Sequence, residues 1–461
     1  MLLPTALYWT GYCRDQRTLY ITVRLCFSTA PWSVCDASQT SECPEEDNPR
    51  LVQEWRMSWR RRSRKVSLDE LRGESLDLGL RVLTARDVPS PLSAAMCHAA
   101  LTELLKTDLS PFQLPQEAEQ QQREEQEVVL LQSEPVQRLF LNKLREVGVA
   151  WNQHPPCSLS VGISRFLLSS AHAIRNTRRK MEDRHVCLPD FNTLTGLKDG
   201  VERSYYAVFD GHGGVDAAIY AAAHLHINLS QQEALTRDPV TAFKAAFTET
   251  NDMFRRKAQR ERLRSGSTAV AVLLQGEWLH VAWLGDSQSM LVRRGQEVSL
   301  MEPHKPERED EKQRIEDLGG CIVFMGCWRV NGTYAVSRAI GDFDQNPYVS
   351  GDADCSSFRL DGDEDYVLLA CDGFFDIVRP EEVPALVLQA LRECGEPQGA
   401  TVGSEVGALG VGVAQKLVAH AKEAGSSDNI TVMVVFLRPP EQLLIRDPEK
   451  TSVTAEGPVL E

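Results

Sequence analysis

The sequence predicts an α+β fold in which antiparallel sheets are flanked by helices. From about residue 165 onward, short apolar runs rich in Val, Tyr, Phe and Trp alternate with longer stretches of helical periodicity. Some of these runs are separated only by a short turn, such as Gly276-Glu277-Trp278. Such hairpin-like spacing is typical of antiparallel strands, because parallel strands need long crossover connections. The chain of 461 residues is long enough for one large domain with appendages.

Strands are predicted where β-branched and aromatic residues are concentrated between Gly, Asp or Asn. These segments are Tyr205–Phe209, Thr268–Leu274, Leu279–Leu284, Met290–Arg293, Tyr366–Ala370 and Ile430–Leu437. Helices are predicted where apolar residues recur at three- and four-residue spacing. In the main domain these segments are Val215–Asn228, Pro239–Arg264, Glu309–Leu318 and Val411–Ala424.

The first 90 residues are expected to be a poorly structured leader, because their periodicity is weak. Residues 60–65 form a basic cluster, which is either a solvated stretch, a nuclear-import signal or a contact with an anionic surface. Residues 91–155 are expected to be helical, with an acidic linker at Glu117–Glu127 between two amphipathic segments. Three interpretations of these two helices are open: they form a regulatory module, they pack on the main domain, or they have no particular partner.

The main domain is expected to span residues 160–438 and to be followed by a flexible tail at 439–461. A Gly-rich segment at 395–412 interrupts two helical stretches and is interpreted as an inserted loop.

Composition excludes several classes of protein. The chain has 65 acidic and 50 basic residues, a net charge of −15, which argues against nonspecific nucleic-acid binding. No apolar run reaches the roughly 18–20 residues that a membrane-spanning helix needs. The twelve cysteines are scattered without zinc-ligand spacing, so we expect reduced thiols and a cytoplasmic location, with a nuclear fraction possible.

Acidic residues stand at the ends of four apolar segments. Asp210 follows YYAVF, Asp286 follows HVAWLG, Asp372 follows YVLLAC, and Asp428 precedes ITVMVVFL. Each one alone is compatible with ordinary turn chemistry. Together they are harder to explain, because a buried carboxylate without compensation costs several kcal/mol. Divalent cations would compensate them, and oxygen ligands without adjacent Cys or paired His favour Mg²⁺ or Mn²⁺.

Seven short motifs follow one another through the main domain. They are RRKMED (178–183), VFDGHGG (208–214), SGSTA (265–269), WLGDS (283–287), VSRAIGD (336–342), ACDGFFD (370–376) and SSDNITVMVV (426–435). Together they resemble the metal-dependent protein serine/threonine phosphatases, the type 2C or PPM family. The resemblance implies a four-layer αββα sandwich, with two central antiparallel sheets flanked by helices, and assigns residues 160–438 to a phosphatase domain.

The resemblance also implies a metal site with two ions, Mg²⁺ or Mn²⁺. Asp210 would bridge the two ions. The carbonyl of Gly211 and, mainly through water, Glu182 would serve one ion, and Asp372 and Asp428 would hold the other. Two such ions can share a water, lower its pKa and present hydroxide to phosphorus.

Three further assignments follow from the resemblance. Asp286 and Asp376, with Asp372, match a weaker third metal site. Arg178 matches the arginine that binds the substrate phosphate, where its planar fork meets two oxygens at once. His212 matches the proposed general acid, which would protonate the serine or threonine leaving group.

The segments HAIRNTRRKMEDRH and CWRVNGTYAVSRAIGD resemble the branch called calcium/calmodulin-dependent protein kinase phosphatase, or partner-of-PIX phosphatase. This resemblance implies phosphoprotein substrates among calcium/calmodulin-dependent and p21-activated kinases, and PIX-type exchange factors as partners. Two other functions agree less well with the sequence. A pseudophosphatase scaffold is disfavoured because Asp210, Asp372 and Asp428 are all in place, and a phosphodiesterase or nuclease is disfavoured by the acidic charge balance.

Overall fold

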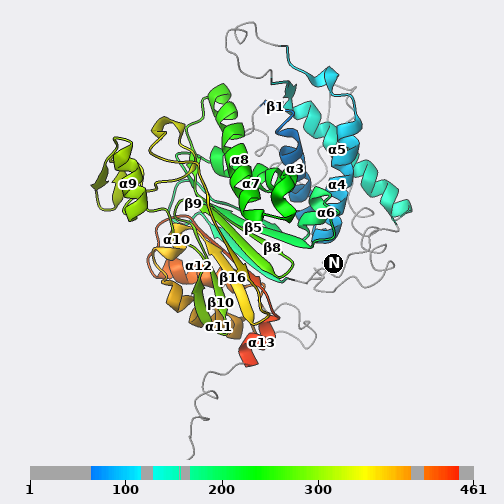
Figure 1. Cartoon of the computed structure of the whole chain (residues 1–461). Coiled ribbons are helices and arrows are strands. Elements are labelled where there is room, and N and C mark those ends of the chain that lie inside the picture. The colour runs from blue at the N-terminus through cyan, green and yellow to red at the C-terminus, as the bar shows by residue number, and fades with distance from the viewer. Residues whose placement is uncertain (1–63, 116–127, 155, 157–166, 396–409, 446–461) are drawn as a thin grey trace, which may run out of the picture.

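The computed structural model describes residues 64–115, 128–154, 156, 167–395 and 410–445. Within these residues, two five-stranded antiparallel sheets stack face to face, and helices cover both outer faces (Figure 1). The predicted α+β sandwich is therefore confirmed. The basic cluster at 60–65 lies mostly outside the described residues, as do the acidic linker and most of the Gly-rich insertion.

The first sheet has the strand order β15-β9-β8-β5-β4. Its strands are β4 (Arg184–Leu188), β5 (Arg203–Phe209), β8 (Ala269–Gln275), β9 (Trp278–Leu284) and β15 (Asp354–Arg359). The second sheet has the order β11-β10-β16-β17-β3. Its strands are β3 (Ser169–Ile174), β10 (Gln288–Arg293), β11 (Gln296–Ser299), β16 (Glu364–Ala370) and β17 (Ile430–Phe436).

The hairpin between β10 and β11 shows how the local sequence fixes register. Arg293 pairs with Gln296, so only Arg294 and Gly295 lie in the turn. Both have positive φ, 53° and 76°, as a two-residue type I′ turn requires. The two strands therefore meet in a single register.

Alternation along β5 explains why the sheets stack. Tyr206 and Val208 point into the core between the two sheets, where they join Val367 and Met433 of the second sheet. Tyr205, Ala207 and Phe209 belong instead to the core under the helices. Both faces of the strand are thus apolar and buried, as expected for a central strand of a layered fold.

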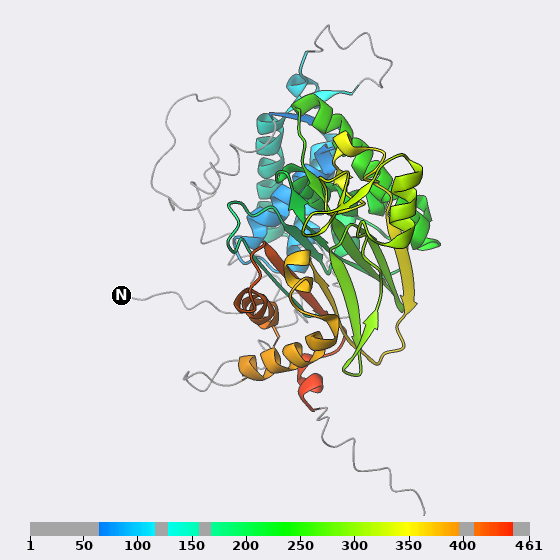
Figure 2. The same cartoon turned by 90° about the vertical axis from the view of Figure 1, so that its left-hand side faces the viewer.

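Long helices form the outer layers (Figure 2). Helices α7 (Asp216–Gln231) and α8 (Pro239–Glu261) cover the first sheet, whereas α11 (Val383–Gly395) and α12 (Val413–Glu423) cover the second. The start of α8 is fixed by its sequence. The Asp238 carboxylate accepts from the Thr241 backbone N–H at 3.1 Å, and Pro239 occupies the first turn.

A further helical layer lies on the α7 side (Figure 1). It consists of α3 (Leu71–Thr84), α4 (Ser90–Lys106), α5 (Ser133–Gln153) and the short α6 (Phe191–Thr195). Their apolar residues share one core with α7, α8 and the first sheet. The sequence left three alternatives open for the two amphipathic segments. In the structure both helices pack on the main domain.

The structure differs from the expected leader at residues 65–84. These residues form β1 (Lys65–Ser67), which pairs with β2 (Leu130–Gln132), and α3. Gly73 and Gly79 lower the helix propensity of α3 and weaken its signal in the sequence. Close packing requires glycine at both positions, because a side chain would clash. A Cβ at Gly73 would lie 2.4 Å from His224 Nδ1, and one at Gly79 would lie 2.7 Å from Cys97 Sγ.

Smaller elements complete the fold. The expected flexible tail begins with a short helix, α13 (Pro440–Ile445), which differs from the prediction. The other elements are β6 (Gly211–His212), β7 (Gly266–Ser267), β12 (Ile322–Phe324), β13 (Trp328–Val330), β14 (Ile340–Gly341), α9 (Glu309–Asp317), α10 (Asp372–Phe375) and the 3₁₀ turns Ser110–Phe112, Glu233–Thr236, Phe343–Gln345 and Pro380–Glu382. No helix in the described part of the chain is both long and apolar enough to cross a membrane.

Candidate active site

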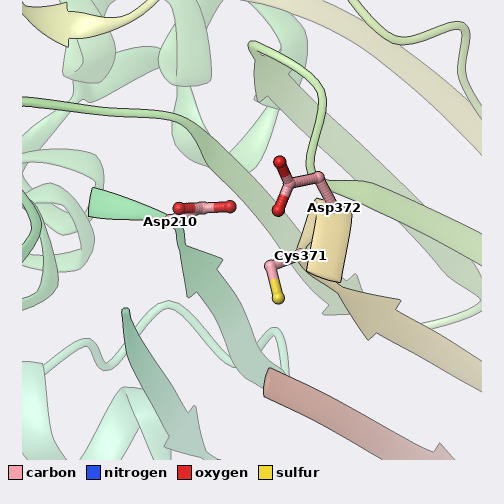
Figure 3. A group of neighbouring side chains, drawn as sticks. All are labelled: Asp210, Cys371 and Asp372. Atoms are coloured by element: carbon pink, nitrogen blue, oxygen red, sulfur yellow. The ribbon is translucent and has the colours of Figure 1, made fainter. Parts of the chain in front are cut away.

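Two aspartates from different sheets meet at one end of the sandwich. Asp210 directly follows β5 of the first sheet, and Asp372 begins α10 just after β16 of the second sheet. Their carboxylates point toward each other, with the Cys371 thiol beside them (Figure 3). One ligand atom from each of these three residues lies within 4.8 Å of the other two. The sandwich thus brings together two acidic residues that are 162 positions apart in the sequence.

Asp428 lies next to this pair because α10 approaches β17 closely. A Cβ on Gly373 would lie 3.3 Å from the Asp428 Cβ and 2.0 Å from the Asn429 carbonyl oxygen. Only glycine allows that approach. The same strand also places Asp183, whose carboxylate accepts from the Thr431 hydroxyl at 2.6 Å.

The electrostatics of these carboxylates are unfavourable without a cation. Burial raises the pKa of Asp210 well above its usual range, and the charges of Asp372 and Asp183 raise it further. Burial also raises the pKa of Asp183, and that of Asp286, to about 7. Like charges in a desolvated site disfavour ionisation unless a positive charge compensates them.

Unsatisfied oxygen atoms indicate what that positive charge is. Asp372 Oδ1 and Asp183 Oδ1 are buried and have no hydrogen-bond partner among the described residues. A buried acceptor without a hydrogen-bond donor is costly. A divalent cation would compensate the negative charge of these oxygen atoms. The ligand atoms are mainly carboxylate oxygens, so the site fits Mg²⁺ or Mn²⁺.

Glu182 and Gly211 lie side by side at the edge of the cluster. A Cβ on Gly211 would lie 2.6 Å from the Glu182 carbonyl oxygen, so a side chain at position 211 would force the two segments apart. The Glu182 N–H donates to Asn429 Oδ1 at 2.8 Å, which ties this segment to the start of β17. The structure therefore brings both residues to the site.

The residues expected for a third metal, Asp286 and Asp376, lie close enough to Asp372 to interact with it electrostatically. Asp286 is buried, and after burial itself the charge of Asp372 is the largest influence raising its pKa. Asp376 is 57 % exposed and pairs with Lys305, whose Nζ lies 3.3 Å from Asp376 Oδ1. Lys305 is not among the residues predicted from the sequence, although it stands in the run Pro303-His304-Lys305-Pro306, 19 residues after Asp286.

Arg178 forms an ion pair with Asp428 through Nη2. Its side chain is 59 % exposed, so much of the guanidinium reaches solvent beside the carboxylate cluster. A phosphate oxygen entering from solvent can therefore meet this fork without rearrangement of the backbone.

His212 is held by a residue that the sequence analysis did not select. Its Nε2 lies 2.5 Å from Asp342 Oδ2, and Asp342 is almost fully buried. Burial alone would lower the pKa of His212, but the hydrogen bond and charge of Asp342 outweigh it and raise the pKa. In the sequence, Asp342 is the last residue of the VSRAIGD motif and follows Gly341.

Cys371 packs in the core between the sheets, as expected for a small apolar side chain, and it also makes polar contacts. Its Sγ accepts from the Thr431 N–H at 3.2 Å and lies 3.5 Å from the Asn429 carbonyl oxygen. Burial raises the pKa of this thiol well above its usual range, so it stays protonated at neutral pH. No described cysteine is in a disulfide.

Comparison with known proteins gives a consistent result. Residues 168–430 match the family model described as protein phosphatase 2C. The chain is 52 % identical over 406 residues to human protein phosphatase 1F, an alignment that covers 87 % of each chain. It is 50 % identical to mouse protein phosphatase 1E over 82 % of this chain and 48 % of that protein.

Solved structures share the fold. A C. elegans sex-determining protein superimposes with a TM-score of 0.67 at 23 % identity, over 86 % of this chain and 94 % of that one. A serine-threonine phosphatase 2C from Toxoplasma gondii superimposes with a TM-score of 0.50 at 21 % identity, over 58 % of this chain and 94 % of that one. The superposition with the C. elegans protein also includes residues that precede the family match at 168–430.

Proposed function

The chain belongs to the protein phosphatase 2C family and is a protein serine/threonine phosphatase, and from this premise we propose that Mg²⁺ or Mn²⁺ ions held by the carboxylate cluster drive the hydrolysis. The observation that carries this proposal is the pair Asp210 and Asp372. These buried carboxylates face each other from two sheets, and Asp372 Oδ1 has no partner among the described residues. The repulsion between them would favour protonation of one carboxylate, and a bound divalent cation would remove it.

Two ions account for the arrangement of ligands. In this proposal Asp210 would contribute to both ions, Glu182 and the Gly211 carbonyl to one, and Asp372 and Asp428 to the other. A third, weaker site would use Asp286, Asp376 and Asp372. When bound, the ions supply an acidified water as the nucleophile near neutral pH.

The protein's own groups bind the phosphate and handle the proton. Arg178 would donate two hydrogen bonds to the phosphate oxygens, with Asp428 fixing its guanidinium. His212 would be protonated by virtue of Asp342 and would give its proton to the leaving serine or threonine oxygen. Since Cys371 is a protonated, buried thiol, no covalent phosphocysteine is part of the proposal.

The substrates form the second part of the proposal. The resemblance of residues 172–185 and 327–342 to partner-of-PIX phosphatases supports calcium/calmodulin-dependent and p21-activated kinases as substrates, and PIX-type exchange factors as partners. Dephosphorylation of those two kinases, compared with an unrelated phosphorylated kinase, tests this part.

The variant Asp210→Asn tests the metal site. We expect it to lower kcat on a phosphothreonine peptide by at least about 10³-fold, because one bridging carboxylate is lost, while the variant remains folded. The assay compares phosphothreonine and phosphotyrosine peptides with added Mn²⁺, and with chelator as the control. Asp252→Asn, on the exposed face of α8, is the matched variant and should retain activity.

Two results would contradict the proposal. One is full activity of the wild-type protein in chelator. The other is an Asp210→Asn variant that shows the same Mn²⁺ dependence and the same kcat as the wild type.

A further inference from the structure

Four basic residues lie in a single loop beside the candidate active site. The loop runs from Arg175 to Lys180 between β3 and β4, and it contains Arg178 and Arg179 as well. The proposed reaction uses only Arg178. Arg175, Arg179 and Lys180 are exposed, and among the described residues their side chains have no ion-pair or hydrogen-bond partner. Such a concentration of free cations stands out in a chain with a net charge of −15.

The loop is fixed to the protein at both ends by one buried side chain. Asn429 Nδ2 donates to the carbonyl oxygens of Arg175 at 2.9 Å and Lys180 at 3.0 Å. These two oxygens share one donor nitrogen, so they lie no more than about 6 Å apart. The six residues therefore form a closed loop rather than an extended strand.

Two further contacts hold the first half of the loop. Asn176 Nδ2 donates to the Ser426 carbonyl at 2.6 Å, and the Thr177 hydroxyl donates to the Ser427 carbonyl at 2.5 Å. Asn176 has a φ of 51°, which turns the chain back on itself. The backbone is thus held in place, so the basic side chains project from a fixed position.

Arg178 connects this loop to the site. It pairs with Asp428, which lies next to the Asp210–Asp372 cluster, so the phosphate-binding position and the other three cations belong to the same closed loop. One phosphoryl group is served by one guanidinium fork and the metal site. The remaining three cations are exposed on the same closed loop, so a second anion close to the bound phosphoryl group would meet them.

We propose that Arg175, Arg179 and Lys180 form a second anion subsite, which selects phosphoprotein segments with a further phosphate or carboxylate close to the phosphoserine or phosphothreonine being hydrolysed. This inference rests on the proposed function and names the substrate class of the same site. Phosphate and carboxylate share the chemistry that the subsite recognises, namely charge-assisted hydrogen bonds from guanidinium and ammonium groups.

Three phosphothreonine peptides of equal length test the proposal. They carry neutral residues, acidic residues or a second phosphothreonine next to the reacting one. For the wild type in Mn²⁺ we expect kcat/KM to be about tenfold higher for the two anionic peptides than for the neutral one, mainly through KM, as a few exposed ion pairs provide. Comparison of the two anionic peptides distinguishes carboxylate from phosphate.

The variants are the double change Arg179→Gln/Lys180→Gln and the single change Arg175→Gln. We expect the ratio of kcat/KM between anionic and neutral peptides to fall toward one in the double variant. Lys198→Gln is the matched control, because Lys198 is exposed at the opposite end of β5 from Asp210, and it should keep the wild-type ratio. The ratio should also shrink between about 0.05 and 0.5 M salt, since exposed ion pairs are screened.

A wild-type ratio near one would overturn the subsite. So would a double variant that loses activity equally on all three peptides, because that pattern indicates a disturbed loop rather than lost recognition. Failure of the proposed function looks different, since then the wild type hydrolyses the peptides equally well in chelator, or hydrolyses none of them. In that case fluorescence anisotropy with the labelled doubly phosphorylated peptide still tests whether the double change weakens binding while Lys198→Gln does not.

Discussion

Asp342 shows how one buried carboxylate sets the state of a reactive side chain. It lies at a φ of 47° after Gly341 and directs Oδ2 to His212 Nε2. A Cβ on Gly266 would lie 2.2 Å from the same oxygen, so the strand carrying Gly266 leaves room for this contact. Asp342 does not reach the substrate in our proposal. It positions the imidazole and raises its pKa.

The variant Asp342→Asn should therefore change the pH profile rather than only the rate. An acid must be protonated to act, so kcat falls as pH rises through the pKa of His212. Since Asp342 raises that pKa, its neutral replacement should move the fall in kcat to lower pH. At neutral pH we expect a loss of roughly tenfold or more on a phosphothreonine peptide and a smaller loss on an aryl phosphate, whose leaving group needs less protonation.

The measurement is kcat against pH for both substrates, with His212→Ala as the reference. Equal losses on the two substrates, or an unchanged pH profile, would rule out the positioning role of Asp342.

At the scale of elements, an ionic network fixes α9 to the body of the protein next to the site. Glu311 on α9 is almost fully buried, and its carboxylate accepts from Arg338 at 2.6 Å and from Arg314 at 2.9 Å. Arg338 also donates to Asp354 at the start of β15. Since Arg338 belongs to the VSRAIGD motif, the network links α9 to the segment that carries Asp342.

This network predicts loss of stability in acid. Burial opposes ionisation of Glu311, but the hydrogen bonds from Arg338 and Arg314 outweigh it and lower the pKa from 4.5 to about 2. A carboxylate with a lowered folded-state pKa stabilises the fold above its unfolded pKa and loses that contribution as pH falls through the folded pKa. We expect the contribution, at most roughly 3 kcal/mol, to be lost between about pH 4.5 and pH 2.

Urea unfolding between pH 7 and pH 3 measures this dependence. Glu311→Gln should lower the unfolding free energy at pH 7 and flatten its decrease in acid, whereas Glu316→Gln, on the exposed side of α9, should follow the wild type. The assignment fails if Glu311→Gln and wild type show the same decrease below pH 4.5.

At the scale of the whole molecule, the helices before residue 154 are part of the catalytic fold. Leu71, Leu76 and Leu83 of α3 lie in the same core as Tyr205 and Phe209 of β5. A buried ionic contact closes this interface. Glu70 is 2 % exposed, and its carboxylate accepts from the Ser67 N–H at 2.8 Å and from Arg260 of α8 at 3.3 Å.

We predict that Glu70→Gln lowers the free energy of unfolding of the whole domain by roughly 1–3 kcal/mol, because Lys257 and Arg260 lose a buried partner. Asp69→Asn is the matched control. Asp69 pairs with Arg256 at the surface, so its loss should cost less than about 1 kcal/mol.

Urea unfolding followed by both circular dichroism and tryptophan fluorescence should give one coincident transition at a lower midpoint for Glu70→Gln. Separate transitions, with the N-terminal helices unfolding first, would show that they are not integral to the domain.

The central strands, the main helices and the positions of the acidic residues along them could be predicted from the amino-acid sequence. Strands such as Tyr205–Phe209 are visible because their apolar character is local, and Asp210 is visible because it stands at the end of such a run. The motif resemblance then indicated the family. The roles of Asp210, Asp372 and Asp428 as metal ligands remain predictions that the variants above test.

The partners that each residue meets could not be predicted in this way, because they come from distant parts of the chain. Asp342 is 130 residues from His212, and Thr431 is 248 residues from Asp183, so no local pattern signals either contact. The same holds for α3, whose glycines weaken its helical signal but allow close packing, Gly73 against α7 and Gly79 against α4. Local sequence encodes secondary structure through short-range sterics and periodicity, whereas the positioning of His212, the closed loop at 175–180 and the docking of the N-terminal helices depend on contacts that exist only once the sheets have stacked.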